Sequence, residues 1–279
     1  MKRIFDEKHL KLMANTLRQD VVKMLLESQS GHMAGPLGMA DIFSALYFNF
    51  LNINPKNPNA IDRDYLILSN GHICPILYAS MAHAGFFDIS ELKTFRKLGS
   101  RLQGHPHKGS LPEIETSSGP LGEGLAQSAG IALALKNDHK QNKVICITSD
   151  GEHDEGSTWE AIMFASKYEL GNLTVIVDRN KIQLDGNTEQ IMPLKSLKEK
   201  YLAFGWGVLE INGNDMKQVL DALNIVAIPR EKPLAIIAHT IPGKGVSFME
   251  HRYEWHGKAP NKDEADKALI ELNEERNRI

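Results

Sequence analysis

Residues 149–180 read SDGEHDEGSTWEAIMFASKYELGNLTVIVDRN, and this stretch decides the fold. An apolar run at 143–148 precedes it, a helical pattern fills 157–169, and a second apolar run occupies 173–178. Two such runs joined by a helix predict a parallel β-α-β unit, whose right-handed crossover makes the strands neighbours or near-neighbours. Asp150 and Asn180, which follow the two strands, should therefore emerge at the same edge of a sheet.

The rest of the chain extends this pattern in both directions. Apolar runs at 65–69, 201–211 and 234–240 predict three more strands. Helices are expected at 6–29, 40–50, 70–86, 125–136, 215–226 and 261–279. Strands that alternate with helices, several of them apolar on both faces, indicate an α/β fold. We expect a doubly wound, mainly parallel sheet with helices on both faces, formed by one domain over 1–279.

Composition excludes several classes of protein. The hydrophobic share of 42% is enough for a substantial core, and the 32 basic and 35 acidic residues give a net charge of only −3. This balance argues against a partner nucleic acid or an anionic membrane. The N-terminus lacks the apolar core of a signal peptide, and no run approaches the roughly 18 apolar residues of a membrane span. We expect a cytoplasmic protein whose two cysteines, Cys74 and Cys146, are buried and reduced.

Polar clusters follow the predicted strands, where open parallel sheets bind their ligands. These clusters are Ser69–His72, Ser149–Glu155, Asp178–Ile182 and His239–Gly245. Asp150, Asn180 and a backbone carbonyl just after Asn180 offer oxygen atoms, the ligands that Mg²⁺ prefers beside phosphate and water. A polar strand end with an ordinary Asp-Gly turn is the alternative.

Two further features lie near these clusters. Ser157 and Glu160 have the spacing of a capping box, whereas the charge of Glu155 has no local explanation. Gly119, Gly122 and Gly124 open a predicted helix whose first amides could face an anion, although glycine there could also serve close packing alone.

Several motifs together resemble the N-terminal, thiamine diphosphate-binding half of transketolase over nearly the whole chain. In the family's order and approximate spacing they are SGHMAGPLGMA (30–40), SNGHICPILY (69–78), GHP (104–106), SSGPLGEG (117–124), SDGEHDEGSTWEA (149–161) with DRNKIQLDG (178–186), and WHGKAP (255–260). One departure is Ser149, which stands where the family's metal motif usually begins with glycine. A positive φ there would strain serine.

The resemblance implies a cofactor and its ligands. Asp150, Asn180 and the carbonyl of Ile182 match the ligands of Mg²⁺, for which Ca²⁺ or Mn²⁺ could substitute. Contacts to thiamine diphosphate are implied for His72, Gly119, Pro120, Leu121, Asp150, Gly151, Glu155, Glu160, Asn180 and His256. Glu155 and Glu160 match acidic positions at the family's subunit interface.

Four of the 11 histidines match residues at the family's reaction centre. His32, His105 and His256 resemble those that line the substrate channel and assist proton transfer, and His72 resembles a diphosphate contact. We predict these four as catalytic residues. Solvent exposure is expected for His9, His83, His139 and His153, whereas His107 and His251 are left unassigned.

The resemblance also implies a partner. In the family, a glutamate from a second, pyrimidine-binding domain activates the cofactor, and no segment here resembles that domain. We expect the N-terminal subunit of a split transketolase that transfers a ketol unit between sugar phosphates, in an assembly with two copies of each chain. The partner should supply most of the recognition of the distal phosphate. The alternatives are a 2-oxo-acid dehydrogenase-like α-subunit, a transketolase for an unusual sugar (a sulfo-sugar or a branched pentose phosphate), and a non-catalytic thiamine diphosphate-binding protein.

Overall fold

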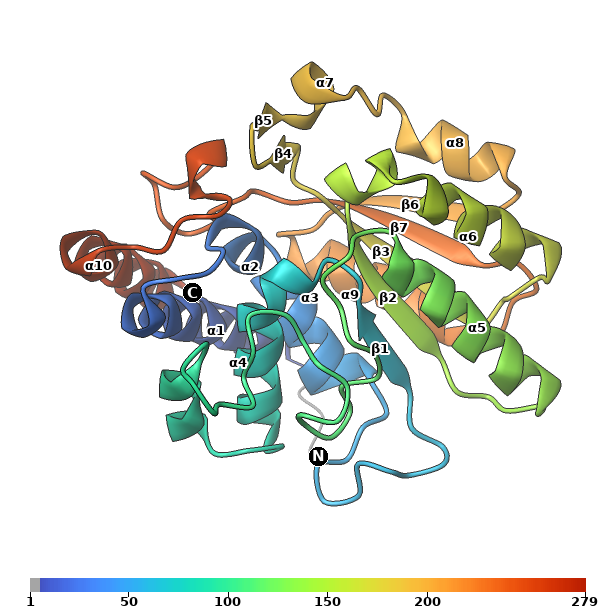
Figure 1. Ribbon diagram of the computed structural model, residues 1–279, viewed down its shortest axis with the longest axis horizontal. Helices are drawn as coiled ribbons and strands as arrows, with labels where there is room; N and C mark the ends of the chain where they lie inside the picture. Colours follow the sequence, from blue (N-terminus) through green and yellow to red (C-terminus); the bar gives the residue numbers. More distant parts are fainter. Residues whose placement is uncertain (1–5) are drawn as a thin grey trace.

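A computed structural model describes residues 6–279 and contains a five-stranded, fully parallel sheet (Figure 1). The strands lie in the order β1 (Tyr65–Leu68), β2 (Val144–Ser149), β3 (Leu173–Arg179), β7 (Leu234–His239) and β6 (Gly207–Asn212). The predicted β-α-β unit is confirmed, because β2 and β3 are direct neighbours and Ser149 pairs with Asp178.

Two hydrophobic cores cover the two faces of the sheet. Alternate residues of β2 point in opposite directions, so Ile145 and Ile147 join one core while Val144 and Cys146 join the other. The first core is closed by α1 (Glu7–Ser28), α2 (Ala34–Gly38), α3 (Ala40–Ala45), α4 (Cys74–Ala84), α9 (Met216–Ala227) and α10 (Lys262–Arg278). The second is closed by α5 (Glu123–Asn137), α6 (Gly156–Lys167) and α8 (Leu197–Ala203). The predicted doubly wound arrangement is therefore confirmed.

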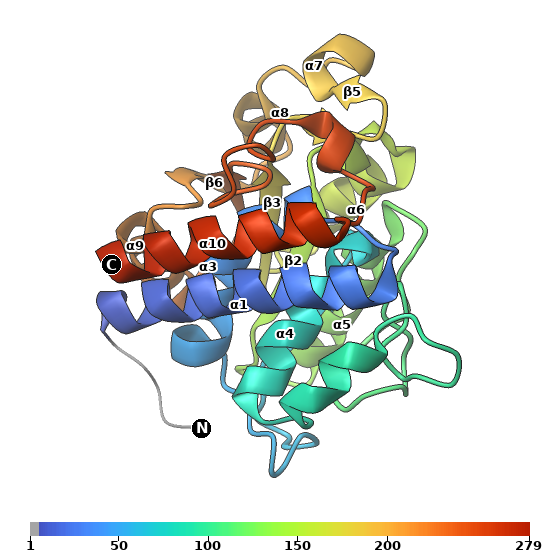
Figure 2. The same ribbon diagram turned by 90° about the vertical axis from the view of Figure 1, so that its left-hand side faces the viewer.

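The first and last helices lie side by side on the outside of the first core (Figure 2). The Asn15 side chain of α1 donates a hydrogen bond to the Leu272 carbonyl of α10 at 2.9 Å. A capping box of Asn261 and Glu264 begins α10. The amphipathic helix predicted at the end of the sequence is thus confirmed.

The structure corrects three predicted boundaries. The strand expected from residue 201 begins only at Gly207, because Tyr201 belongs to α8. Gly205, with a φ of 85°, turns the chain between the end of α8 and the start of the strand. The helix expected over 40–50 changes after α3 into a π-helical turn, η1 (Leu46–Phe50). The helix expected from residue 70 begins with a 3₁₀ turn, η2 (Gly71–Ile73), before α4.

At the carboxyl edge of the sheet, a small projection follows β3. It consists of the hairpin strands β4 (Ile182–Gln183) and β5 (Gly186–Asn187) and the short helix α7 (Thr188–Ile191), at the top of Figure 1.

Cys74 and Cys146 are buried free thiols, as expected. Among residues 6–279, every helix is too short or too polar to cross a bilayer.

Candidate active site

Asp150 and Asn180 lie at adjoining strand ends, as the sequence predicted. The Asp150 amide donates to the Asp178 carbonyl at 3.1 Å, which continues the β2–β3 ladder by one step. Asp150 is fully buried and Asn180 is only 8% exposed. Parallel pairing therefore holds one carboxylate and one carboxamide together at the edge where ligands of such sheets bind.

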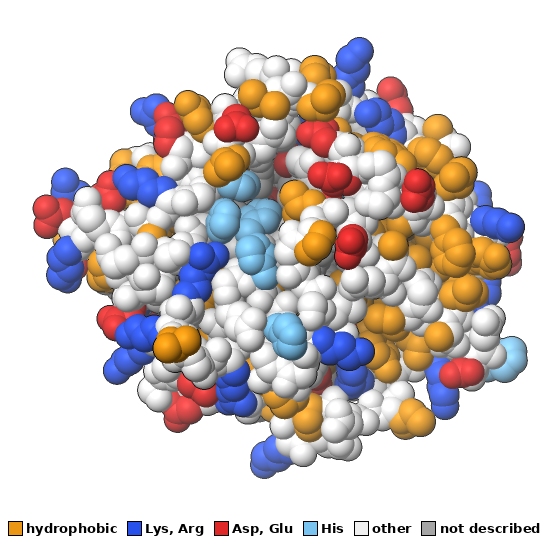
Figure 3. Space-filling view, in the orientation of Figure 1, with side chains coloured by type: hydrophobic (Ala, Val, Ile, Leu, Met, Phe, Trp, Pro, Cys, Tyr) orange, Lys and Arg blue, Asp and Glu red, His pale blue; other side chains and the backbone are white. Residues whose placement is uncertain are grey.

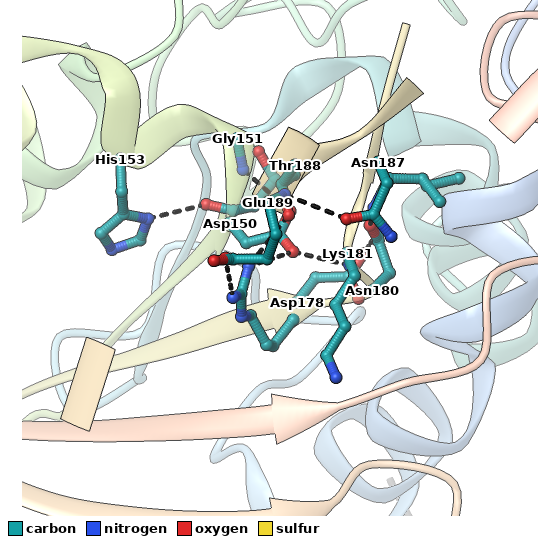
Figure 4. Close-up of polar contacts among 12 residues, drawn as sticks. Asp150, Gly151, His153, Asp178, Asn180, Lys181, Asn187, Thr188 and Glu189 are labelled. Atoms are coloured by element: carbon teal, nitrogen blue, oxygen red, sulfur yellow. Dashed lines mark hydrogen bonds and ion pairs between the residues drawn. The ribbon is translucent and has the colours of Figure 1, made fainter. Parts of the chain in front are cut away.

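A closed set of hydrogen bonds holds the Asp150 carboxylate (Figure 4). Its Oδ1 accepts from the Gly151 amide at 2.8 Å, and its Oδ2 accepts from the Lys181 amide at 2.7 Å and from Arg179 Nη1 at 3.1 Å. Arg179 also donates to Thr188 Oγ1 at 3.1 Å and contacts Glu189 Oε1 at 2.6 Å. Burial raises the pKa of Asp150 to about 6, although the positive charge of Arg179 opposes this rise.

Asn180 is oriented by a second buried acid, Asp178. The Asn180 Nδ2 group donates to Asp178 Oδ2 at 2.8 Å, and its Oδ1 accepts from the Ile182 amide at 3.0 Å. Asp178 also accepts a hydrogen bond from the Thr240 hydroxyl group. Burial raises the pKa of Asp178 to about 7. Asp178 thus holds the Asn180 side chain with its Nδ2 toward Asp178 and its Oδ1 toward the Ile182 amide.

Sequence reasoning assigned no role to Arg179 or Asp178. Both lie within one or two residues of the predicted ligand Asn180, and a cation or an acid that close to a buried oxygen donor is a signal that could have revealed them.

The residues present at this edge fit a diphosphate held through a divalent cation. A carboxylate, an amide oxygen and the carbonyl of Ile182 are all oxygen donors, as Mg²⁺ requires. Within residues 6–279 no group of three histidine, cysteine or acidic side chains could hold a metal. Asn70, fully buried before His72, has no partner in the described part of the chain for either side-chain polar atom. Buried polar atoms without partners mark a place where a ligand can bind.

Three of the four predicted catalytic histidines meet at the same edge. His32 lies between α1 and α2, His72 in η2 after β1, and His256 just after the turn η5 (Tyr253–Trp255). Ring centroids are 4.9 Å apart for His32 and His72, 5.1 Å for His72 and His256, and 5.5 Å for His32 and His256. Figure 3 shows histidine side chains gathered in a hollow near the centre of this face. We call His32, His72 and His256 the histidine triangle.

Burial favours the neutral form of all three rings of the histidine triangle. It lowers the pKa of His32 to about 4, and a proton on His256 would lower that pKa further. Burial also lowers the pKa of His72 well below its ordinary value and lowers the pKa of His256. A neutral imidazole offers one N–H donor and one acceptor, and the buried Nδ1 of His32 has no partner among residues 6–279. The triangle can therefore hydrogen-bond to hydroxyl groups in either direction.

The fourth predicted histidine, His105, borders the triangle from the long segment before α5. A Cβ atom added to Gly71, next to His72, would lie 3.2 Å from His105 Cδ2, and one added to Gly119 would lie 3.9 Å from His105 Cγ. His105 is more exposed than the other three, yet partial burial still lowers its pKa. Pro120 is exposed and Leu121 half-buried just before α5.

The start of α5 meets a buried acid rather than open space. Gly122, with φ of 83°, is the N-terminal cap, and its amide donates to Glu152 Oε1 at 2.7 Å. The fully buried Glu152 also accepts from the Ser149 amide at 3.2 Å and from the Ser69 hydroxyl group. The Gly122 amide, which the sequence suggested could face a bound anion, is thus hydrogen-bonded to the carboxylate of Glu152. Sequence reasoning did not predict this role of Glu152.

The predicted capping box of Ser157 and Glu160 is wrong. Helix α6 begins at Gly156 with Glu155 as its cap and has no side-chain cap, so Ser157 lies two positions past the cap. Glu155 and Glu160 are both exposed. They lie at the start and on the surface of α6, and their roles as cofactor contacts and at a subunit interface remain predictions.

Two other expectations need correction. His153, expected in solvent, is 2% exposed, with contacts of 2.9 Å from Nδ1 to the Ser149 carbonyl and from Nε2 to the Tyr201 hydroxyl group. His83 is half-buried and pairs with Asp20. Ser149 is not among the residues with positive φ, so replacement of the family's glycine carries no strain of that kind.

Comparison with known proteins places this geometry in a family. Residues 9–276 match the family model described as transketolase, thiamine diphosphate binding domain. A subunit of an apulose-4-phosphate transketolase from Actinobacillus succinogenes is 40% identical over 97% of this chain and 98% of the relative. A subunit of a 6-deoxy-6-sulfo-D-fructose transketolase from Clostridium sp. (strain MSTE9) is 37% identical over 94% and 95%.

A solved structure agrees. The crystal structure of transketolase from Campylobacter jejuni superposes with a TM-score of 0.89 at 35% identity, and the match covers 95% of this chain and 42% of that chain. The chain spans less than half of that transketolase but nearly all of the two relatives named as subunits. It belongs to the transketolase family and corresponds to the family's thiamine diphosphate-binding domain.

Proposed function

We propose that this chain is the thiamine diphosphate-binding subunit of a two-subunit transketolase that moves a two-carbon ketol unit from a ketose phosphate to an aldose phosphate. One observation carries the proposal. The oxygen donors of Asp150 and Asn180 lie at the same sheet edge as the histidine triangle, so a metal-held diphosphate and a polyhydroxylated substrate could bind side by side.

The strand tips would hold the cofactor through Mg²⁺. Asp150, Asn180 and the Ile182 carbonyl supply the ligands, and Ca²⁺ or Mn²⁺ could take the same oxygen atoms. Gly151 and His72 are proposed to contact the diphosphate. Contacts to the rings of thiamine diphosphate are proposed for Gly119, Pro120, Leu121 and His256.

When bound, thiamine diphosphate supplies a nucleophilic carbon that takes up and releases the ketol unit. The chain's own contribution is to position sugar hydroxyl groups and to move their protons. Burial favours the neutral form of each ring of the histidine triangle, and a neutral ring can accept a hydroxyl proton through one nitrogen while the other nitrogen donates. Burial of the rings keeps water from competing for these hydrogen bonds.

A partner chain would complete the site. Exposed apolar side chains on and just after α6, Met163 at 57%, Phe164 at 37% and Tyr168 at 40%, offer a surface of the kind that protein partners cover. Glu155 and Glu160 lie at the cap and on the surface of the same helix. We propose that the partner carries the pyrimidine-binding domain and its glutamate, and that two copies of each chain assemble in the cytoplasm. The relatives from Actinobacillus and Clostridium are both named as single subunits of a transketolase, which supports a second chain.

Mixing experiments test the proposal. The chain alone should show no turnover, and addition of a purified pyrimidine-domain partner should give ketol transfer that depends on thiamine diphosphate and Mg²⁺. Coupled spectrophotometric assays with ketose phosphate donors and aldose phosphate acceptors measure it. No transfer in any combination would contradict the proposal.

The same reconstituted pair separates the alternatives. Decarboxylation of pyruvate without ketol transfer would identify a 2-oxo-acid dehydrogenase-like chain. Calorimetric binding of thiamine diphosphate without either reaction would identify a non-catalytic binding protein. A panel that includes sulfo-sugars and branched pentose phosphates tests whether the substrate is an unusual sugar.

A further inference from the structure

A cationic pocket of about 600 Å³ adjoins the histidine triangle. Among the residues that line it, the argument uses Ser30, Arg96, Gly104, His105 and Ser118. Cationic side chains line this pocket, but no aspartate or glutamate does. We call it the Arg96 pocket.

Arg96 has an incomplete set of partners. Its Nη1 donates to the Ser30 hydroxyl group at 2.8 Å and its Nη2 to the Gly104 carbonyl at 3.5 Å, but its Nε is buried without a hydrogen bond. Within residues 6–279 no carboxylate forms an ion pair with it, whereas the neighbouring Lys97 pairs with Glu27. An unneutralised guanidinium in a concave, partly buried place has spare capacity for an anion.

The backbone builds this arrangement. Arg96 has φ of 58°, a left-handed conformation that is uncommon outside glycine, and its amide donates to the Leu102 carbonyl at 2.9 Å. The guanidinium packs directly on Gly104, where an added Cβ atom would lie 2.7 Å from Arg96 Nε. The side chain is therefore held by a specific loop shape rather than being free at the surface.

The Arg96 pocket is continuous with the candidate active site. The buried Ser118 hydroxyl group has no partner within residues 6–279, and a Cβ atom on Gly71, beside His72, would lie 2.2 Å from it. His105 lines the pocket and borders the histidine triangle. Arg96 and His105 both line the pocket, and the charge of Arg96 contributes, after burial, to the lowered pKa of His105.

We propose that Arg96, Ser30 and Ser118 bind the anionic end group of the sugar substrate, a phosphate or a sulfonate, while the histidine triangle holds its hydroxyl groups. This inference rests on the proposed function. It assigns part of the distal anion recognition to this chain, whereas the sequence led us to expect most of it from the partner. Phosphate and sulfonate both present three oxygen atoms, which suit the forked donors of a guanidinium.

Substrate discrimination in the reconstituted pair tests the assignment. We would measure kcat/KM for a phosphorylated acceptor, D-ribose 5-phosphate, and for a phosphate-free acceptor, glycolaldehyde. Arg96→Gln should lower the ratio of the two values roughly tenfold to hundredfold, since one charge-assisted hydrogen-bonding group is lost. Arg96→Lys should give an intermediate loss, because it keeps the charge without the fork. Arg101→Gln is the matched control, as Arg101 pairs with Glu91 outside the pocket and should leave the ratio unchanged.

A binding measurement on the full chain gives an answer independent of turnover. Inorganic phosphate and methanesulfonate would each be titrated while the His105 ring is followed by NMR. Saturable shifts with either anion that disappear in Arg96→Gln support the assignment, and the stronger anion indicates which end group the pocket favours. A wild-type chain that binds neither anion overturns it.

The outcomes separate the two proposals. Ketol transfer with an unchanged ratio in Arg96→Gln would refute the anion site and leave the proposed function standing. Absence of ketol transfer with every substrate would refute the proposed function, and the anion titration would then decide the role of Arg96.

Discussion

The two halves of the candidate active site treat their polar groups in opposite ways. At the strand tips, Asp150, Asp178 and Asn180 are nearly or fully buried, and hydrogen bonds from other parts of the protein orient each of these side chains. Around the histidine triangle and the Arg96 pocket, His32 Nδ1, Arg96 Nε and the Ser118 hydroxyl group are buried without partners in the chain from residue 6 onward. The first region is satisfied within the protein, and the second is not.

This difference fits the two tasks proposed for the two regions. A site that must present oxygen atoms to a metal in fixed positions benefits from partners that orient every atom in advance. A site that must bind, shift and release a flexible sugar needs free donors and acceptors. We therefore expect substitutions at the strand tips to affect both folding and cofactor binding, and substitutions at the histidine triangle to affect turnover with little effect on folding.

The largest effect is expected for Asp150→Asn. The loss of charge should weaken thiamine diphosphate binding by the reconstituted pair by ~100-fold or more, since a direct metal ligand is altered. The same change removes one of the two carboxylates that contact the buried Arg179, Glu189 being the other, and turns one accepting oxygen opposite the Gly151 and Lys181 amides into a donor. An unsatisfied buried donor should lower the free energy of unfolding of the chain by roughly 1–3 kcal/mol. Calorimetric titration and urea denaturation measure the two effects. Unchanged values in both would show that the strand tips hold no metal.

A smaller effect, with little change in stability, is expected for His72→Asn. Turnover of the reconstituted pair should fall roughly 100-fold, because one group that handles protons is lost. The free energy of unfolding should change by less than about 1 kcal/mol, since within residues 6–279 the His72 ring makes no hydrogen bond that would be broken. Steady-state kinetics and urea denaturation check this pair of values. A loss of stability as large as that of Asp150→Asn would break the contrast between the two regions.

The smallest effect concerns a histidine that is satisfied within the protein. Burial lowers the pKa of His153 to about 4, below the unfolded value near 6.5, so the unfolded chain binds more protons between these pH values. His153 therefore contributes roughly 2–3 kcal/mol to the free energy of unfolding above pH 6.5. This contribution is lost as the pH falls from 6.5 toward 4.

Comparison with a variant isolates this contribution from that of other groups. Asp150 and Asp178, whose pKa values are raised, act in the opposite direction over part of the same range. Urea denaturation at pH 4.5 and pH 7 gives the free energy of unfolding of the wild-type chain and of His153→Asn. The wild-type value minus the variant value should be larger at pH 7 than at pH 4.5. A difference independent of pH would contradict the assignment of a buried, neutral His153.

The sheet could be predicted from the sequence because local pattern alone determines it. The apolar runs at 143–148 and 173–178 have the length and composition of buried strands, and chirality fixes the crossover between them. The proximity of Asp150 and Asn180 then follows from topology. The start of β6 was mispredicted because Tyr201, an aromatic residue typical of strands, is held in α8 by packing against His153 and Trp206.

The fine structure of the site depends on contacts that no local pattern encodes. Glu152 and His153 occur in a polar turn, where exposure is the ordinary expectation, yet they are buried by Ser69, Gly122 and Tyr201 from distant parts of the sequence. Whether Arg96 has an ion-pair partner likewise depends on which carboxylates the fold brings next to it. Contacts between residues that are far apart in the sequence become known only from the three-dimensional structure.

The buried carboxylate of Glu152 has a mechanical consequence. It joins the residue after β1, the last residue of β2 and the cap of α5 through hydrogen bonds to a single charged group. If one of these segments moved without the others, a charge would be left unsolvated in the interior, at a cost of several kcal/mol. We therefore expect the three segments that Glu152 joins to move together as one rigid unit. Any opening motion of the candidate active site would then come from loops outside these segments.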